Sequence, residues 1–361
     1  MKKIAITLIL LMTISLTSCT SSNKTPQDNN NNKNSTPSAT ITPSEENPKV
    51  SDYFPFKKDV YKRYKGNGNE YLDRETYVDF IHEDKMQIRS INPGTTAIVI
   101  YEIKDGALKR VYSRGEAYYR YDYTSFKGDE EILIKEPIKV GTSWTLKDGT
   151  VRSITGIDKE IETPSGKYKA LEITTNEKDG SEADYYVKDI GHVKYVYKPK
   201  DGSFTLLSEL EEMQENKPLV QNIRFYFPDT STEKQVYIDR NVEMLTNEDM
   251  KYKFQKELKT VPEGSKLAKV LPKDTQVSTP ILDEEKGTVT INFSSHLIND
   301  ANAGVGFESM LLDCIANTFG DYYNVDKVVI TVDDKLYESG HFMLKPGEYL
   351  AVDTKNIPQY K

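Results

Sequence analysis

Cysteine, histidine and tryptophan are scarce in this chain of 361 residues, which has two, four and one of them. Two cysteines allow at most one intrachain disulfide, and Cys314 has no partner once Cys19 is modified, so packed apolar cores must supply the stability. The histidines lie far apart, and none belongs to a His-Glu-x-x-His or His-x-His arrangement, which are spacings typical of metal ligands. We therefore predict no metal site and no cofactor. The histidines are His82, His192, His296 and His341.

Motifs of known catalytic sites are also missing. The sequence has no Gly-x-Ser-x-Gly elbow, phosphate loop or dinucleotide fingerprint. Ser294, Ser295 and His296 adjoin Asn292 just after an expected strand, but a catalytic triad depends on spatial roles rather than contiguity. Turn and cap chemistry explains this run of residues better. We therefore predict no catalytic residues, and an envelope hydrolase is the least favoured alternative.

Long apolar runs are confined to the N-terminus. Two lysines precede the apolar run 4–16, which is shorter than the ~20 residues that a membrane helix needs. Small residues follow it, as in a secretory signal. Residues 16–19, "LTSC", resemble the bacterial lipobox. The resemblance implies that residues 1–18 are a signal peptide and that Cys19 receives a diacylglycerol. The mature chain would then be held at the outer face of the cytoplasmic membrane in a Gram-positive-type envelope.

Basic residues are outnumbered by acidic ones. The chain has 48 Lys and Arg against 56 Asp and Glu, a formal charge of −8. Removing Lys2 and Lys3 with the signal leaves 46 against 56, or −10. Nucleic acid binding requires clustered basic side chains, so nucleic acid is not an expected partner. Anionic lipid would repel the chain as well, so the lipid on Cys19 must supply the membrane affinity.

A polar segment, residues 19–50, follows the signal. Ile41 and Val50 are almost its only sizeable apolar side chains. Such a segment buries too little surface to offset its ordering entropy, and we expect a disordered, lipid-anchored linker. As a flexible coil of about 30 residues it would span roughly 30 Å root mean square. The folded part could thus stand away from the membrane.

Residues 51–212 have the pattern of an antiparallel β domain. Short runs rich in Tyr, Val, Ile and Thr flank Asp-Gly pairs, which tolerate the positive φ angles of tight hairpin turns. Four such signals in succession predict a β meander, curved into a sheet or partial barrel. The Asp-Gly pairs lie at 105–106, 148–149, 179–180 and 201–202.

Aromatic residues in this domain offer two interpretations. The run "YYRYDY" at 118–123 would place Tyr119, Tyr121 and Tyr123 on one face of a strand. Exposed, these rings could stack on sugars or a peptide; buried, they would be core, which is the favoured interpretation. Trp144 is likewise expected in the core.

The pattern changes near residues 213–221, where charge, Gln and Pro suggest a linker. In the following domain, 222–340, the expected order is strand, strand, helix, strand, strand, helix, strand. Thr246 or Asn247 is expected to cap the first helix. This order predicts an α+β sandwich, a sheet with two helices on one face, followed by a tail at 341–361.

The expected second helix carries an apolar stripe. Residues at i, i+3, i+4, i+7 and i+8 lie on one face of a helix. Cys314 lies on that stripe, so we interpret it as a small buried hydrophobe, with a reactive thiol as the alternative. The stripe consists of Phe307, Met310, Leu311, Cys314 and Ile315.

Two acidic turns are expected in this domain. Asp283, Glu284 and Glu285 are interpreted as a solvated turn, with a weak calcium site as the alternative. The last strand is expected to turn at Asp333 and Asp334.

The first domain resembles a recurrent β domain of Gram-positive lipoproteins over about residues 52–212. That family brings no assigned activity, so the resemblance implies only a fold. It is carried by "DYFPFKKDVYKRYKGNGNEY", "IKVGTSWTL", "ITGIDKEIETPSGKYKALEIT" and "YYVKDIGHVKYVY".

The second domain resembles the GerMN domain family of sporulation and germination lipoproteins over about residues 222–340. The order and spacing of the matching pieces carry the resemblance. The chain departs from the family at the turn 259–264 and at Asp274, where Gly is common, and it contains one such domain rather than two in tandem. The matching pieces are "FYFPD", "VYIDR", "LAKVLPKDT", "GTVTINFSSHL", "GFESMLLDCIANTF" and "VDKVVITVDD".

The second resemblance implies a non-catalytic scaffold or protein-interaction factor in sporulation or spore germination. Its expected partners are envelope or sporulation proteins, with peptidoglycan as a further candidate, and exposed strand edges and helix faces are the natural contact surfaces. The alternative is a ligand-binding or carrier lipoprotein that uses the concave side of the β domain. Apolar residues lining an open cavity would favour that alternative, and a filled interior would exclude it.

Overall fold

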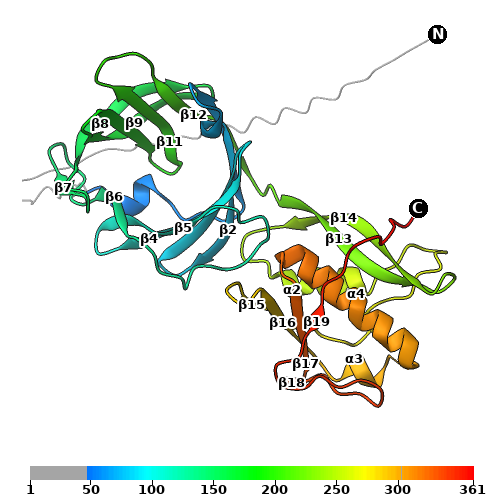
Figure 1. Cartoon of the computed structure of the whole chain (residues 1–361). Coiled ribbons are helices and arrows are strands. Elements are labelled where there is room, and N and C mark those ends of the chain that lie inside the picture. The colour runs from blue at the N-terminus through cyan, green and yellow to red at the C-terminus, as the bar shows by residue number, and fades with distance from the viewer. Residues whose placement is uncertain (1–46, 302) are drawn as a thin grey trace, which may run out of the picture. The chain divides into compact units, whose positions relative to one another are not determined.

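The computed structural model of the protein describes residues 47–301 and 303–361 (Figure 1). Contacts group Asn47–Lys361 into one compact unit. The expected signal peptide, Cys19 and the expected linker up to residue 46 lie outside the described residues. None of the helices in residues 47–301 and 303–361 combines the length and the hydropathy of a transmembrane span.

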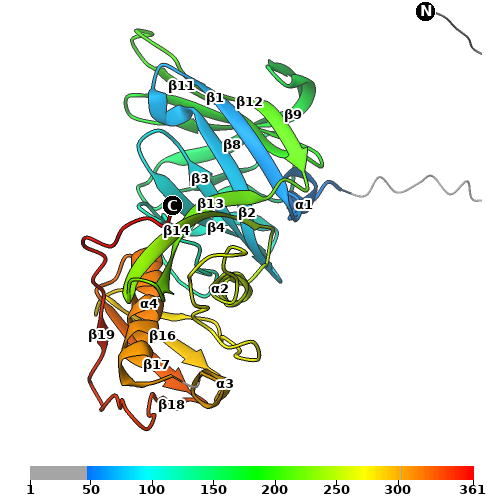
Figure 2. The ribbon, with the colours of Figure 1, turned by 90° about the vertical axis from the view of Figure 1, so that its right-hand side faces the viewer.

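A 12-stranded antiparallel sheet dominates the N-terminal half and curves until its two edges nearly meet (Figures 1 and 2). The strands are β1 (Val60–Asn67), β2 (Arg74–His82), β3 (Lys85–Ile91), β4 (Thr96–Lys104), β5 (Ala107–Arg114), β6 (Glu131–Lys135), β7 (Ser143–Thr145), β8 (Val151–Thr163), β9 (Gly166–Asn176), β10 (Gly180–Val187), β11 (Gly191–Pro199) and β12 (Leu206–Glu215), with a 3-10 turn at Glu70–Leu72. β1 and β12 pair at the centre, and β6 and β7 are the edges. This arrangement confirms the predicted meander, curved into a partial barrel.

The four Asp-Gly pairs lie at four connections between antiparallel neighbours. They occur between β4 and β5, β7 and β8, β9 and β10, and β11 and β12. At the first of these turns, Asp105 and Gly106 have φ angles of 53° and 67°. Two-residue hairpin turns need such positive angles, which Asp and Gly adopt more readily than other residues. The four predicted hairpins are therefore confirmed.

Side chains bridge the two edge strands of the curved sheet. Trp144 Nε1 on β7 donates a hydrogen bond of 3.0 Å to Ile132 O on β6, and Arg152 Nη1 on β8 donates to the same oxygen at 3.0 Å. Arg152 also forms a 2.9 Å ion pair with Glu131 on β6. Trp144 is buried, as predicted for a core residue. In the described residues, β6 and β7 do not pair through their backbones. These side-chain contacts therefore join the two edges of the sheet.

The short helix α1 (Val50–Tyr53) packs into an apolar cluster inside the curved sheet. Val50, Tyr53 and Phe54 are buried in this cluster together with Tyr186 of β10. The backbone N–H of Val50 also donates to Glu136 Oε1 at 2.9 Å. The end of the expected linker is therefore part of the folded domain.

The C-terminal half combines two sheets and three helices (Figure 2). Its strands are divided between a two-stranded ribbon and a mixed five-stranded sheet, in which one pair, β16 and β17, is parallel. The predicted α+β class is confirmed, with two sheets in place of the single expected one. The elements are β13 (Leu219–Asp229), β14 (Lys234–Met244), α2 (Met250–Leu258), β15 (Ile281–Asp283), β16 (Thr288–Phe293), α3 (His296–Asn299), α4 (Val305–Tyr323), β17 (Lys327–Val332), β18 (Lys335–Leu336) and β19 (Leu350–Ala351).

Helix α4 supplies much of the C-terminal core. Its Phe319 ring lies 4.4 Å from the Phe254 ring of α2 and 6.3 Å from the Phe293 ring of β16, measured between centroids. Cys314 on the same helix is fully buried, and this burial raises the pKa of its thiol well above the ordinary value. Cys314 is therefore a small buried hydrophobe, as predicted.

The N-cap of α2 differs from the prediction. Asp249 accepts the capping hydrogen bond, whereas Thr246 and Asn247 were the expected caps. Those two side chains are engaged elsewhere, because Thr246 Oγ1 donates to Val78 O at 2.9 Å and Asn247 Nδ2 donates to Ile81 O at 3.0 Å. Both acceptors belong to β2, so residues expected to cap a helix instead connect the two halves of the molecule.

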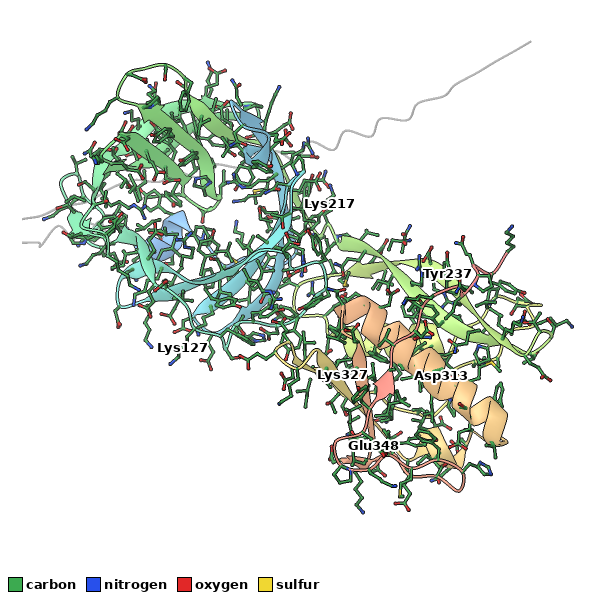
Figure 3. All side chains as sticks on the ribbon, in the orientation of Figure 1. Lys127, Lys217, Tyr237, Asp313, Lys327 and Glu348 are labelled. Atoms are coloured by element: carbon green, nitrogen blue, oxygen red, sulfur yellow. The ribbon has the colours of Figure 1, made fainter. Side chains whose placement is uncertain are left out.

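The linker expected at 213–221 is shorter in the structure. β12 ends at Glu215 and β13 begins at Leu219. Within this connection, Lys217 (Figure 3) lies with its Nζ 3.4 Å from the centroid of the Tyr61 ring. The connection is therefore short and in contact with β1.

Two features near the C-terminus belong to the fold. Asp333 and Asp334 have φ angles of 48° and 63° and form the turn between β17 and β18, as predicted. In the expected tail, 341–361, β19 pairs with β17 and Gln359 bridges to Tyr237 of β14. The tail thus pairs with both sheets.

Candidate ligand-binding cavity

A cavity of about 1110 Å³ lies on the concave side of the curved sheet. It is slightly larger than the range of roughly 300–1,000 Å³ that is common for small-molecule sites. Its lining residues alternate along the strands, as the inward-facing side chains of a pleated strand must. The alternation is seen in Val60, Lys62 and Tyr64 on β1, Arg74, Thr76 and Val78 on β2, and Glu182, Asp184 and Tyr186 on β10.

The wall of this cavity is mainly apolar. Aliphatic and aromatic side chains reach it from both sides of the curved sheet, and Phe54 connects it to the apolar cluster around α1. An apolar wall of this kind favours the transfer of an apolar ligand surface out of water. The apolar lining includes Val78, Met86, Ile88, Val99, Tyr101, Tyr186 and Met213.

Two cations, Lys62 and Arg74, lie in the cavity wall on neighbouring strands. Lys62 Nζ donates a hydrogen bond of 2.5 Å to the carbonyl oxygen of Ile190. Burial, together with the charges of Lys57 and Arg74, lowers the pKa of Lys62 to about 7. Its amine therefore titrates near neutral pH, far below the ordinary value of about 10.4 for lysine.

The Arg74 guanidinium is held in place by its neighbours. Its Cζ lies 4.3 Å from the centroid of the Tyr64 ring, within the range of a cation–π contact. Nη1 of Arg74 donates to Ser208 Oγ at 2.8 Å. The Tyr64 hydroxyl in turn donates to His192 O at 2.9 Å. The positive group is thus fixed at the wall before any ligand arrives.

A histidine–carboxylate pair lies in the wall beside these cations. His192 Nε2 and Asp184 Oδ1 are 2.8 Å apart. Burial lowers the pKa of His192, and the nearby charges of Arg74 and Lys62 act in the same direction, while the hydrogen bond with Asp184 opposes them. The pair supplies a polar contact inside a largely apolar wall.

Other ionic groups of the cavity are paired with one another. Arg152 forms its 2.9 Å ion pair with Glu131, which also accepts a hydrogen bond from Arg110. The carboxylate of Glu182 accepts from the Tyr195 hydroxyl at 2.9 Å. Burial raises the pKa of Glu182. Glu131 thus neutralises part of the positive charge in the wall, whereas the Tyr195 hydroxyl leaves the charge of Glu182 in place.

The structure places Tyr119, Tyr121 and Tyr123 away from this cavity and outside any strand. Tyr119 and Tyr123 are buried in a cluster that also contains residues of the C-terminal half, and Tyr121 is partly buried against it. The Tyr119 ring lies 5.6 Å from the ring of Tyr323 on α4, between centroids. The predicted strand is therefore wrong, because the chain forms an irregular segment that packs between the two halves. These rings do not form an open aromatic face.

Glu284 lies in the exposed turn that was expected, but its carboxylate is engaged by residues of the N-terminal half. Its carboxylate forms an ion pair with Arg114 and accepts hydrogen bonds from the hydroxyls of Tyr119 and Tyr123, the latter at 2.9 Å. Burial would raise the pKa of Glu284, but these hydrogen bonds outweigh it and lower the pKa. The neighbouring Asp283 forms an ion pair with Lys286. The described residues contain no group of three His, Cys, Asp or Glu that could hold a metal.

A buried ion network lies where the two halves meet. Asp79 on β2 is fully buried and forms ion pairs with Arg89 at 2.9 Å and with Arg120 at 3.1 Å. Arg120 Nη2 also donates to Leu245 O, beyond β14, at 2.8 Å. The backbone N–H of Arg120 donates to the Tyr322 hydroxyl of α4 at 2.9 Å. The network therefore attaches the irregular segment around Arg120 to both halves.

The serines beside His296 have structural roles. Ser295 occupies the N-cap position of α3 without a side-chain capping bond, and its backbone N–H donates to Asp333 Oδ1 at 3.2 Å, while Ser294 Oγ accepts a hydrogen bond of 3.0 Å from the backbone N–H of Gln276. The four histidines face separate carboxylates and are not brought together. The pairs are His82 with Asp122, His192 with Asp184, His296 with Asp300, and His341 with Glu308.

Lys62 and Arg74 were missed by sequence reasoning. The sequence did contain one signal for them: a basic residue on the same strand face as apolar residues, as Lys62 is between Val60 and Tyr64. Both faces of β1 carry tyrosine and basic residues, so the sequence alone does not distinguish the face that turns inward. The curvature of the sheet determines it.

Comparison with a family model identifies the C-terminal domain. Residues 224–338 match the model of the Germane family, described as "Sporulation and spore germination". This domain is therefore GerMN-like, as the sequence predicted. No curated protein matches the chain.

Three solved structures are similar to parts of the chain. The tandem GerMN domains of GerM from Bacillus subtilis match with 17% identity and a TM-score of 0.29, over 37% of this chain and 46% of that one, so this chain spans less than half their length. A protein described as exported, with a YmcC-like fold, from Bacteroides fragilis matches with 11% identity and a TM-score of 0.31, over 45% of this chain and 99% of that one. A protein described as a lipoprotein from Clostridium perfringens matches with 20% identity and a TM-score of 0.25, over 37% of this chain and 88% of that one.

Proposed function

We propose that this protein is a non-catalytic, lipid-anchored binding protein of the cell envelope that acts in sporulation or spore germination. The observation that carries the binding role is the cavity of about 1110 Å³, whose wall combines an apolar surface with many charged and polar side chains. The Germane match supports the cellular process. Of the two roles considered from the sequence, the cavity favours ligand binding over a scaffold that only docks proteins.

The binding role predicts uptake of a neutral apolar probe. N-phenyl-1-naphthylamine, which fluoresces strongly out of water, is expected to bind the protein with enhanced emission. Ser90, which lines the cavity from β3, is replaced by Trp to occupy the space, and affinity should fall roughly tenfold or more. Ser113→Trp, at an exposed position on β5, is the matched control and should bind as the wild type does. Equal emission with and without protein would contradict the binding role.

Membrane attachment through Cys19 is the second part of the proposal. Lipid on Cys19 would hold the cavity at the envelope, because two acyl chains give a stable anchor where one gives a marginal anchor. Replacing Cys19 by Ala should release the protein from the membrane fraction or leave it unprocessed. Retention of lipid-labelled protein in the membranes of the variant would overturn the anchor.

The Germane domain is the proposed surface for envelope or sporulation partners, and peptidoglycan is a further candidate. In the same Cys19→Ala experiment, cross-linking on intact cells should trap discrete partners with the wild type and lose them with the released variant. Recovery of the wild type as a free monomer throughout growth and sporulation would contradict partner docking.

A further inference from the structure

Lys62 and Arg74 are cations without an acidic partner. Neither side chain forms an ion pair with a carboxylate anywhere in residues 47–301 or 303–361. Lys62 Nζ uses one of its three donors on Ile190 O, and Arg74 uses Nη1 on Ser208 Oγ. Donors on both groups therefore remain for a ligand.

The remaining cations of the cavity differ in this respect. Lys109, Arg110, Lys147 and Arg152 each form an ion pair with a nearby carboxylate. Lys57 donates to a backbone carbonyl oxygen at the edge of the same group. Among the described residues, the cations of the wall that form no ion pair are thus Lys57, Lys62 and Arg74, and the wall also contains three carboxylates that form none, Asp148, Glu177 and Glu182.

Two acidic side chains of β10 near this site, Asp184 and Glu182, already form hydrogen bonds with neighbouring side chains. Asp184 is bonded to His192 at 2.8 Å, and Glu182 accepts from Tyr195 at 2.9 Å. Neither carboxylate is among the causes of the lowered pKa at Lys62, which are burial, Lys57 and Arg74. An unpaired charge in a partly buried wall is costly, so a bound anion would relieve the cost.

We propose that the cavity binds an amphipathic ligand with an anionic head group, a carboxylate or a phosphate, through Lys62 and Arg74. The head group lies against the free donors of the two cations, and a guanidinium held on a tyrosine ring can bind it through two parallel hydrogen bonds. The apolar part of the ligand lies along the wall formed by Val78, Ile88 and Val99. The inference rests on the proposed binding function and names the ligand class for that same cavity.

The test compares three probes with one chain length and different head groups: decanoate, decyl phosphate and decanol. Each competes with N-phenyl-1-naphthylamine at pH 6.5, below its micelle concentration. At least one of the two anions should bind the wild type about tenfold more tightly than decanol, or tighter still. Tighter binding of decanoate would indicate a carboxylate ligand, and tighter binding of decyl phosphate would indicate a phosphate ligand.

Three variants make the test specific. The double variant Lys62→Met with Arg74→Met should bind the anions no better than decanol, while decanol itself binds unchanged. Arg74→Gln, which removes the charge and keeps a hydrogen-bond donor for Ser208, should lose part of the preference and serves if the double variant does not fold. Lys65→Met, on the same strand but exposed and outside the cavity lining, is the control and should retain the full preference.

The outcomes separate this inference from the function on which it rests. Decanol competing as well as both anions, or a double variant with undiminished preference, would overturn the anionic ligand class and leave the cavity as a binding site. Failure of the fluorescent probe to bind the wild type would overturn the binding function together with this inference.

Discussion

Replacing Asp79 by Ala is expected to lower the free energy of unfolding by about 3–5 kcal/mol, the range measured when one member of a buried ion pair is removed. Asp79 is fully buried, and its two oxygens face Arg89 and Arg120, which are themselves almost fully buried. Alanine would leave both guanidinium groups charged and unpaired, since arginine does not lose its proton in proteins.

The loss of stability should be large because the side chains around Asp79 also form hydrogen bonds with backbone carbonyl groups. Gln87 Nε2 donates to Asp79 Oδ2 at 3.2 Å and to Tyr121 O at 2.9 Å, while Arg89 Nη2 donates to Tyr119 O at 2.9 Å. Removal of the carboxylate therefore loosens the side chains that satisfy the irregular segment around Arg120. A buried polar group left unsatisfied costs about 1–3 kcal/mol in itself.

Urea unfolding, followed by circular dichroism and by the fluorescence of Trp144, measures this effect. Trp144 is the only tryptophan, so its emission reports on the curved sheet. Asp129→Ala breaks an exposed ion pair with Lys147 and is the control, with an expected change below about 0.5 kcal/mol. If Asp79→Ala lowers the free energy of unfolding by less than about 1 kcal/mol, the prediction is contradicted, because Arg89 and Arg120 would then not depend on Asp79 for their stabilisation.

The parts of the fold that the sequence predicted correctly are those with local causes. An Asp-Gly pair forms a hairpin because its own φ angles permit the turn, whatever packs around it. The stripe containing Cys314 predicts a buried helical face because helix periodicity is a local property. Closure of the sheet through Trp144, Arg152 and Glu131 depends instead on where two distant edges arrive, and no short run of residues encodes it.

The site was less predictable for the same reason. Glu284 lies in an exposed acidic turn, as its composition indicates, but its ion pair with Arg114, 170 residues earlier in the chain, has no local signal in the sequence. Tyr119 and Tyr123 have the alternation of a strand, yet contacts with the other half of the molecule hold them in an irregular segment. The cavity is a space that side chains do not fill, and a sequence predicts which residues face inward better than how completely they fill the interior.

Replacing Lys62 by Met is expected to have the opposite effect to the Asp79 variant and to raise the free energy of unfolding at pH 7 by roughly 1–3 kcal/mol. Burial and the charges of Lys57 and Arg74 lower the pKa of Lys62 to about 7 in the folded protein, against about 10.4 in the unfolded chain. His192 and Asp184 lie in the same wall, and the other ionisable side chains that line the cavity are Lys57, Arg74, Lys109, Arg110, Asp129, Glu130, Glu131, Lys147, Asp148, Arg152, Glu177 and Glu182, together with Tyr64, Tyr101, Tyr186 and Tyr195. Between these two pH values the unfolded state binds more protons, so the stability of the wild type rises with pH.

The pH dependence follows from that sign. The advantage of Lys62→Met should be largest at pH 7 and below. It should shrink as the pH approaches 10, because the folded wild type has lost the proton near pH 7 and the unfolded chain begins to lose it near pH 10. Urea unfolding at pH 6, 8 and 9.5 measures it. Lys65→Met, exposed on the same strand, should change stability by less than about 0.5 kcal/mol at each pH. A Lys62→Met variant less stable than the wild type at pH 7 would contradict this account.

A cation that costs stability is explained if a ligand supplies the missing negative charge. An anionic ligand beside Lys62 would favour the protonated amine and raise its pKa, so binding would stabilise the wild type and take up a proton near neutral pH. In the presence of saturating decanoate or decyl phosphate, the stability gap between Lys62→Met and the wild type should therefore narrow or reverse. An unchanged gap would mean that the anion does not reach Lys62. Lys62 would then destabilise the folded protein without taking part in ligand binding, which would contradict the role that we assign to it.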